Sequence, residues 1–165
     1  MRTGKCLWNI RYVMTPLNLP SFEYNVKNKD GKVFIFDIIR RKYIQLTPEE
    51  WVRQHFIHYM IQHLGYPKSL IKVETGLVYN QLKKRSDIIV YNRTGDPWLI
   101  VECKSPSQTI NTSTVTQVSV YNVSMKASFV VMTNGIKHIC YSIGSSVDEV
   151  VMMNSFPAFE EKSPS

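Results

Sequence analysis

Apolar residues in this chain fall into short alternating runs around one long stretch with helical spacing. Residues 22–46 hold alternating runs on either side of the Lys-Asp-Gly sequence at 29–31, and a third run follows at 42–46. Alternation with period two is typical of strands that bury one face, and Asp-Gly between two such runs is typical of a tight hairpin turn. This region therefore predicts a small antiparallel meander of three strands.

The stretch with helical spacing begins at Thr47 and ends near Gly65. Thr47 can cap the helix, Pro48 suits its first position and Glu50 completes a capping box. Gly65 is a residue type that commonly ends a helix. The pattern predicts a helix over residues 48–64. Its apolar stripe is Val52, Phe56, Ile57, Met60, Ile61 and Leu64.

Five further apolar runs follow this helix and predict strands, because they are short and rich in Val and Ile. They are IKVETGLVY at 71–79, RSDIIVY at 85–91, WLIVECK at 98–104, SFVVMTN at 128–134 and HICYSI at 138–143.

The segment between the third and fourth of these runs, residues 112–127, fits two structures. Its Val, Thr and Ser content favours a strand. Its length and its position between two strands favour a crossover helix. Periodicity does not decide between them.

Length and composition describe one domain with a core. The 165 residues are 44% apolar, which suits a globular chain, and no apolar run approaches the roughly 20 residues of a membrane helix. We expect an N-terminal extension over 1–19, a single domain over 20–145 and a tail over 146–165 that is weakly ordered beyond Phe159. The first residues lack a continuous apolar segment, so we expect no cleaved signal peptide.

Charge and cysteine content bear on partners and compartment. The net charge of +7 suits a polyanionic partner such as nucleic acid, although many small basic proteins bind none. Cys6, Cys103 and Cys140 are too few and too widely spaced for a disulfide framework or a zinc pattern. We therefore expect a reducing, cytoplasmic setting.

The runs RSDIIVY and WLIVECK can pair as an antiparallel hairpin that sets two carboxylates opposite one another. Pairing Tyr91 with Trp98 matches apolar with apolar residues at the next three positions, which favours this register. The following pair is Asp87 with Glu102, with Cβ atoms roughly 4.5–5.5 Å apart. Facing carboxylates are unfavourable unless a charge offsets them, and a divalent cation that prefers oxygen ligands, such as Mg²⁺ or Mn²⁺, would do so.

Strand alternation places Lys104 on the same face as Glu102, while Cys103 points into the core. An ammonium there can hold an attacking water and neutralise charge that develops in the transition state. Cys103 would offer a metal only its backbone carbonyl. The competing interpretation is a salt bridge at the end of the sheet, between Asp87 and Lys104 or between Glu102 and Arg85.

Three histidines on the first helix, His55, His58 and His63, are a second possible metal site. They lack the HExxH arrangement and do not share one helix face. We expect them to be structural.

The residues of the hairpin resemble the PD-(D/E)XK nucleases. More closely, the chain resembles the N-terminal nuclease domain of type I restriction enzyme R subunits and related stand-alone bacterial proteins. The resemblance runs from about residue 17 to 143. The sequence segments that carry it are LTPEEWVRQ, LGYPKSLIKVE, KKRSDIIVYN, WLIVECKSP, QVSVYN and VVMTNG.

This resemblance implies a fold, an activity and partners. The fold is α/β, with a restriction-endonuclease-like αβββαβ core and a mixed sheet, preceded by the small antiparallel meander; the segment around Gln117 becomes its second helix. The activity is that of a metal-dependent DNA endonuclease of the restriction and defence class, with Mg²⁺ as cofactor and Mn²⁺ able to substitute. The partners are DNA and other subunits of a restriction system, with no membrane. The alternative is a non-catalytic nucleic-acid-binding or assembly module.

The resemblance also carries roles to single residues. Asp87 and Glu102 would bind the metal, with the Cys103 carbonyl, and Lys104 would complete the catalytic set. Gln117 and Tyr121 match a QxxxY element and, at i and i+4 of a helix, would share a face that contacts phosphate.

Two further roles follow from the same resemblance. Arg85, two residues before the aspartate, would touch phosphate. A glutamate of the first helix often joins the metal in such nucleases; Glu49 and Glu50 compete for this role, and Glu50 is preferred.

Overall fold

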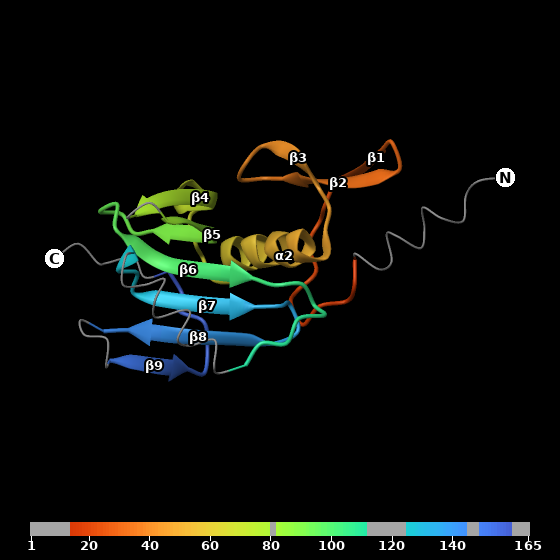
Figure 1. The fold of residues 1–165 in the computed structure, drawn as a ribbon. Helices are drawn as coiled ribbons and strands as arrows, with labels where there is room; N and C mark the ends of the chain where they lie inside the picture. Colours follow the sequence, from red (N-terminus) through yellow and green to blue (C-terminus); the bar gives the residue numbers. More distant parts are fainter. Residues whose placement is uncertain (1–13, 80–81, 112–124, 145–148, 160–165) are drawn as a thin grey trace.

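The computed structural model describes residues 14–79, 82–111, 125–144 and 149–159. It contains a three-stranded sheet, the helix α2 and a six-stranded sheet (Figure 1). The small sheet is β1 (Val26–Lys29), β2 (Lys32–Asp37) and β3 (Lys42–Gln45). Next come α2 (Pro48–Gln62) and the 3₁₀ turn η1 (Lys68–Leu70). The large sheet is β4 (Ile71–Tyr79), β5 (Leu82–Tyr91), β6 (Pro97–Cys103), β7 (Phe129–Thr133), β8 (His138–Ile143) and β9 (Val150–Met153).

The small sheet confirms the predicted meander. Its strands pair antiparallel in the order β1-β2-β3. Asp30 and Gly31 both have positive φ, at 52° and 75°, which is the backbone of the tight turn that the right-handed twist of a hairpin favours. The Asp-Gly signal in the sequence was therefore sufficient to locate this turn.

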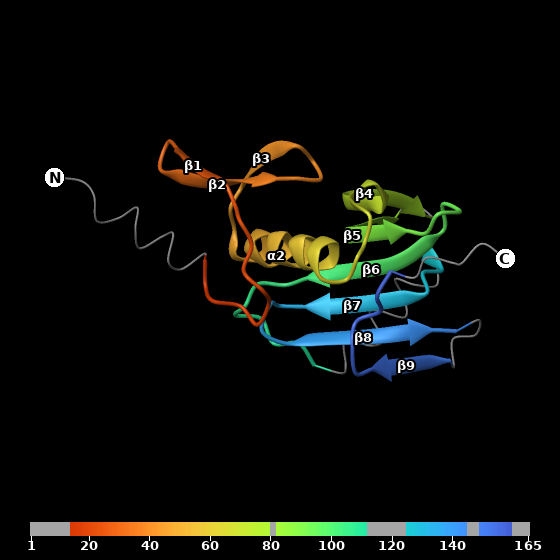
Figure 2. The same ribbon diagram turned by 180° about the vertical axis from the view of Figure 1, so that it is seen from behind.

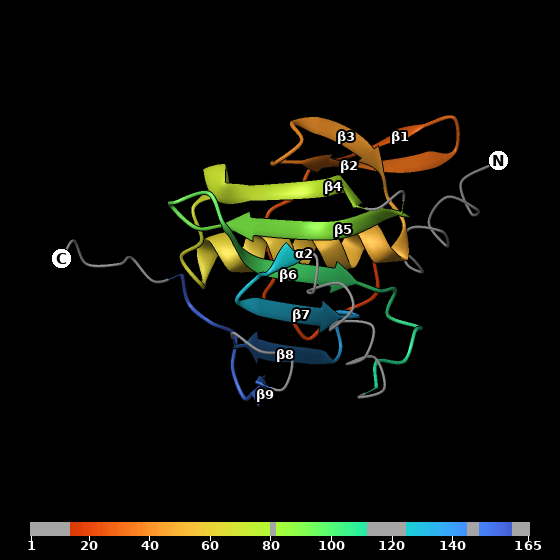
Figure 3. The same ribbon diagram turned by 60° about the vertical axis from the view of Figure 1, so that its left-hand side comes forward.

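Helix α2 begins where the sequence predicts, and it lies between two sheets. The Thr47 hydroxyl accepts the Glu50 amide at 3.0 Å, as a helix cap does. Trp51 packs on the small sheet, while Val52 and Phe56 pack on the large one. Figure 2 shows the helix in front of the large sheet, and Figure 3 shows the sheet in front of the helix. Because both sides are covered, α2 also buries polar residues, namely Glu50, Arg53, Gln54, His55 and His58.

The large sheet is mixed, as expected. The strand order is β4-β5-β6-β7-β8-β9, in which β6 and β7 are parallel and every other neighbouring pair is antiparallel. A parallel pair needs a crossover connection. The predicted second helix around Gln117 falls in this connection, at residues 112–124, and lies outside the described residues.

The hairpin of β5 and β6 keeps the predicted register along its apolar part. Ile88, Ile89 and Val90 face Val101, Ile100 and Leu99. The predicted pair at the loop end, Tyr91 with Trp98, was wrong, because a bulge after Val90 shifts Tyr91 to face Pro97. The shift lies at the loop and leaves the register toward Asp87 unchanged.

At both ends of the described chain, residues outside the expected domain of 20–145 pack against that domain. The Asn18 amide donates to the Gly135 carbonyl at 2.7 Å, so part of the expected extension joins the core. At the other end, β9 pairs with β8, and the Tyr66 hydroxyl donates to the Pro157 carbonyl at 2.7 Å. Residues from 149–159 therefore pair with the sheet and pack against the core. No helix in the described ranges has the length and apolar character needed to cross a membrane.

Candidate active site

The end of β6 and the start of α2 lie at the same end of the molecule (Figures 1 and 2). The ladder between β5 and β6 reaches the pair Ile88 and Val101, which packs under α2. Beyond it, Oδ2 of Asp87 accepts the backbone amide of Cys103 at 2.7 Å. The carboxylate of Asp87 therefore takes the place of a backbone acceptor between the two strands, and the hydrogen bond fixes it beside the end of β6.

Glu102 and Asp87 are close enough to interact electrostatically. Burial raises the pKa of Glu102 above its ordinary value, and the negative charge of Asp87 raises this pKa further. The side chains of Asp87 and Glu102 are 16% and 19% exposed, so water screens their repulsion only in part. The structure thus brings together the two carboxylates that the register predicted.

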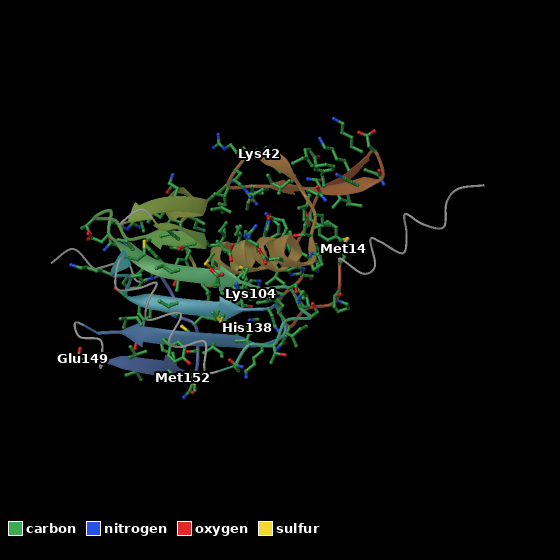
Figure 4. The ribbon with its side chains drawn as sticks, viewed as in Figure 1. Met14, Lys42, Lys104, His138, Glu149 and Met152 are labelled. Atoms are coloured by element: carbon green, nitrogen blue, oxygen red, sulfur yellow. The ribbon has the colours of Figure 1, made fainter. Side chains whose placement is uncertain are left out.

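Lys104 directly follows the last residue of β6 (Figure 4). Its Nζ lies 2.7 Å from Glu102 Oε1. Burial would lower the pKa of Lys104, but the hydrogen bond and the charge of Glu102 outweigh it and raise the pKa, with smaller contributions from Asp87 and Glu49. The side chain therefore remains an ammonium at neutral pH, held against the acidic residues.

The first turn of α2 supplies Glu49 to this group. Burial and the charge of Asp87 raise the pKa of Glu49, while Arg53 and Lys104 partly offset them. Glu49 also contributes to the raised pKa of Glu102. Its side chain is 44% exposed, so it stays accessible from solvent. Glu49 is therefore the helix carboxylate that shares its electrostatic surroundings with Asp87, Glu102 and Lys104.

Glu50, the preferred candidate from the sequence, instead belongs to a buried network of ion pairs and hydrogen bonds. Its side chain is 4% exposed, and one oxygen is bound by Arg40 and Gln54 while the other is bound by Arg53. Both oxygens are thus used inside the protein, between the small sheet and the helix. Of the two glutamates, Glu49 is therefore the one whose carboxylate stays accessible from solvent, and the metal-site role of either stays a prediction.

Arg53 connects these acidic residues, and the sequence analysis did not assign it a place in the site. Its Nη2 lies 2.7 Å from Asp87 Oδ1 and 3.2 Å from Glu49 Oε1, and its Nη1 contacts Glu50. Burial alone would lower the pKa of Arg53, but the charges of Glu50 and Asp87 raise it. Its spacing of three and four residues from the two glutamates indicates helix ion pairs. Its contact with Asp87 arises only from the packing of α2 on β5.

The donor set fits a hard divalent cation. Glu49, Asp87 and Glu102 offer only carboxylate oxygens, which Mg²⁺ and Mn²⁺ prefer. Within the described ranges, however, no three His, Cys, Asp or Glu side chains are already gathered in a metal-binding arrangement. Arg53 holds Asp87 and Lys104 holds Glu102. A cation at this site would therefore share or compete for oxygens that these two bases contact.

Cys103, His55 and His58 have structural surroundings, whereas His63 is exposed. Cys103 is fully buried on the α2 side of the sheet, as alternation predicted; a metal contact through its carbonyl stays a prediction. The His58 ring stacks on Phe22 at 4.1 Å between centroids, and burial lowers its pKa to about 4. His55 also packs edge-on against Phe22 at 4.7 Å, and its ring is buried.

The side chains that the sequence predicts to contact phosphate are not among those that the structure describes. Gln117 and Tyr121 lie outside the described residues. The backbone of Arg85 belongs to β5, paired with Gly76, but its side chain is not among those described. All three roles therefore stay predictions.

Comparisons with known proteins agree with this fold. Residues 48–157 match the family model described as type I restriction enzyme R protein N terminus (HSDR_N). Among solved structures, the chain is similar to a fragment described as an HsdR subunit of a type I restriction enzyme from Vibrio vulnificus YJ016, with 17% identity and a TM-score of 0.51. The match covers 67% of this chain and 23% of that one.

None of the curated proteins compared with the chain matches it significantly. The solved structure supports the fold alone, and the chain corresponds to about a quarter of its length. The family match spans residues 48–157, which include α2, both strands of the site and the end of the sheet. The chain belongs to the family of type I restriction enzyme R protein N termini.

Proposed function

We propose that the chain is a metal-dependent DNA endonuclease domain of a restriction system. The observation that carries the proposal is the meeting of Asp87, Glu102 and Lys104 at one end of the β5–β6 hairpin, where Asp87 raises the pKa of Glu102. Two partly buried carboxylates that face an ammonium suit phosphodiester hydrolysis at a cation. The free thiols of Cys103 and Cys140 suit the cytoplasm that we propose as its setting.

Each residue has a defined part in the proposed reaction. Asp87, Glu102 and Glu49 would hold Mg²⁺ or Mn²⁺, which when bound supplies Lewis acidity and a more acidic water. The ammonium of Lys104 would orient the attacking water and neutralise the charge that develops on phosphate oxygens. The Cys103 amide, through its hydrogen bond, holds Asp87 in place. Arg53 offsets the acidic charge before a cation enters.

Metal dependence with a matched variant tests this function. Supercoiled plasmid is incubated with the protein in Mg²⁺, in Mn²⁺ or in EDTA, alongside Glu102→Gln and the control Glu23→Gln. Glu23 is exposed and lies outside the site. We expect nicked or linear product only with metal, at equal levels for wild type and Glu23→Gln, and reduced by about 10²-fold or more for Glu102→Gln.

Two outcomes of this assay would contradict the proposal. Cleavage that persists in EDTA, or cleavage by Glu102→Gln at the wild-type level, would show that hydrolysis does not depend on a metal held at this site. Binding of the plasmid with no cleavage in either metal would favour the alternative, a nucleic-acid-binding or assembly module. Other subunits of a restriction system, which we propose as partners, could be added in a parallel reaction to test whether they are required.

A further inference from the structure

A second feature of the molecule lies between the two sheets. A groove of about 580 Å³ opens between the turn that joins β2 to β3 and the start of β4. Figures 1 and 3 show this turn beside β4, above α2. Of the eight residues that line it in the described part of the chain, four are basic and none is acidic. The bases are Arg40, Arg41, Lys68 and Lys72.

The turn that presents the two arginines is tightly held. Oδ1 of the buried Asp37 accepts the amides of Ile39 and Arg40, both at 2.7 Å. Oδ2 accepts the Nε of Arg40 at 2.7 Å and an amide hydrogen of Gln54 at 2.8 Å. Arg41 follows with a positive φ of 53° and is exposed. The position of Arg41 is thus fixed by a buried network rather than by a loose loop.

The groove bases differ in how much charge they offer to a ligand. Arg40 already contacts Asp37 and Glu50, so its charge is largely offset within the protein. Arg41, Lys68 and Lys72 are exposed, and Ser69 adds a hydroxyl to the lining. Three cations and a hydroxyl, with no carboxylate among the lining side chains that the structure describes, suit several phosphate groups.

The groove is linked to the candidate active site. Val73, at its β4 side, pairs with Ile88, the residue after Asp87. Arg40 is joined to Asp87 through Glu50 and Arg53. The groove therefore borders the strand that carries Asp87, which suits a ligand with several phosphates that extends beyond the groove.

We propose that this groove binds the phosphodiester backbone of duplex DNA next to the cleavage site. The inference rests on the proposed function for its substrate, but the binding itself needs no metal. Arg41, Lys68 and Lys72 supply the contacts, which are electrostatic and independent of sequence. Each phosphate contact releases bound counterions, so binding through the groove weakens as salt rises.

The test compares two double variants that remove the same charge. The groove variant, Lys68→Gln with Lys72→Gln, removes two cations from the groove. The control variant, Lys126→Gln with Lys137→Gln, removes two exposed lysines next to β7 and β8. Fluorescence anisotropy measures the affinity for a labelled 20-base-pair duplex in EDTA over a salt series, where no metal-dependent cleavage interferes. Thermal unfolding followed by circular dichroism checks that both variants fold.

We expect the groove variant to bind the duplex about 10-fold or more weakly at low salt. The slope of log affinity against log salt should fall by about 1.8, or 0.9 for each lost phosphate contact. The control pair should keep the wild-type slope. Equal slopes for both variants would overturn the proposal, as would equal affinity of the wild type for the duplex and for a labelled mononucleotide.

The outcome is separable from that of the cleavage assay. A wild type that cuts plasmid while the groove variant binds like the control refutes the groove and leaves the nuclease intact. A groove variant that loses binding while the wild type never cuts supports the groove and refutes the nuclease.

Discussion

Asp87→Asn is expected to lower Mg²⁺-dependent cleavage of plasmid DNA by about 10³-fold or more. The substitution removes one negative charge from the oxygens that would hold the cation, and a bound cation stabilises the developing charge by several kcal/mol. About 4 kcal/mol corresponds to roughly 10³ in rate. Single-turnover cleavage of a plasmid by wild type and variant measures the ratio.

The fold should survive this change, which makes the result interpretable. Asparagine keeps a carbonyl oxygen that can accept the Cys103 amide, and Arg53 keeps its contacts with Glu49 and Glu50. Asp96→Asn is the matched control, because Asp96 lies in the exposed loop between β5 and β6. Cleavage by the Asp87 variant within a few fold of the Asp96 variant would exclude Asp87 from the reaction.

Glu50→Gln is expected to lower the free energy of unfolding by about 3 kcal/mol, because it removes a buried carboxylate that two arginines share, while Arg40 keeps Asp37 and Arg53 keeps Asp87 as charged partners. Arg40 and Arg53 both contact the Glu50 carboxylate, and all three side chains are at most 12% exposed. The neighbouring Glu49→Gln should cost less than about 1 kcal/mol, because Glu49 is 44% exposed and exposed ion pairs contribute little. Urea unfolding at neutral pH measures both.

The pair of glutamates separates a structural role from a role at the metal site. If Glu49→Gln destabilised the protein as much as Glu50→Gln, Glu49 would be part of the buried network, and its assignment to the metal site would fail. A stable Glu50→Gln variant would show that the pairs of the two arginines with Asp37 and Asp87 suffice, and that Glu50 contributes little to the network.

The hairpin of the site could be predicted because its pattern is local. Apolar residues match across β5 and β6 in one register only, and this register sets Asp87 and Glu102 at the same end. The bulge escaped prediction because it depends on the loop: Asn92 Oδ1 accepts the amides of both Thr94 and Asp96. These bonds close the loop early and leave Tyr91 opposite Pro97.

The choice between Glu49 and Glu50 could not be made from sequence. A helix covered by one sheet shows its buried face through apolar spacing, but α2 is covered by two sheets, and its polar residues are buried as well. The local pattern offers Glu50 a capping box with Thr47 and offers Glu49 a pair with Arg53, so it does not decide between the two glutamates. The true partners of Glu50, Arg40 and Arg53, include a residue of the β2–β3 turn that only tertiary packing brings close.

Two other features depend on contacts between distant segments. The run Val150–Met153 is short and stands among acidic residues, so it did not indicate a strand; its pairing with β8 makes it one. Arg53 has a helical spacing that predicts pairs with the glutamates, but its contact with Asp87 joins positions 34 residues apart. In both cases the sequence shows the residue and not the partner.

Calorimetric titration with Mn²⁺ is the most direct test of the claim that the acidic residues at the end of the β5–β6 hairpin hold a divalent cation. It compares the wild type with Asp87→Asn, Glu102→Gln and the control Asp96→Asn, in the absence of DNA. The account predicts saturable binding to the wild type and the control, and binding at least about tenfold weaker in each site variant, since each loses a charged ligand. Identical isotherms for all four proteins would contradict it.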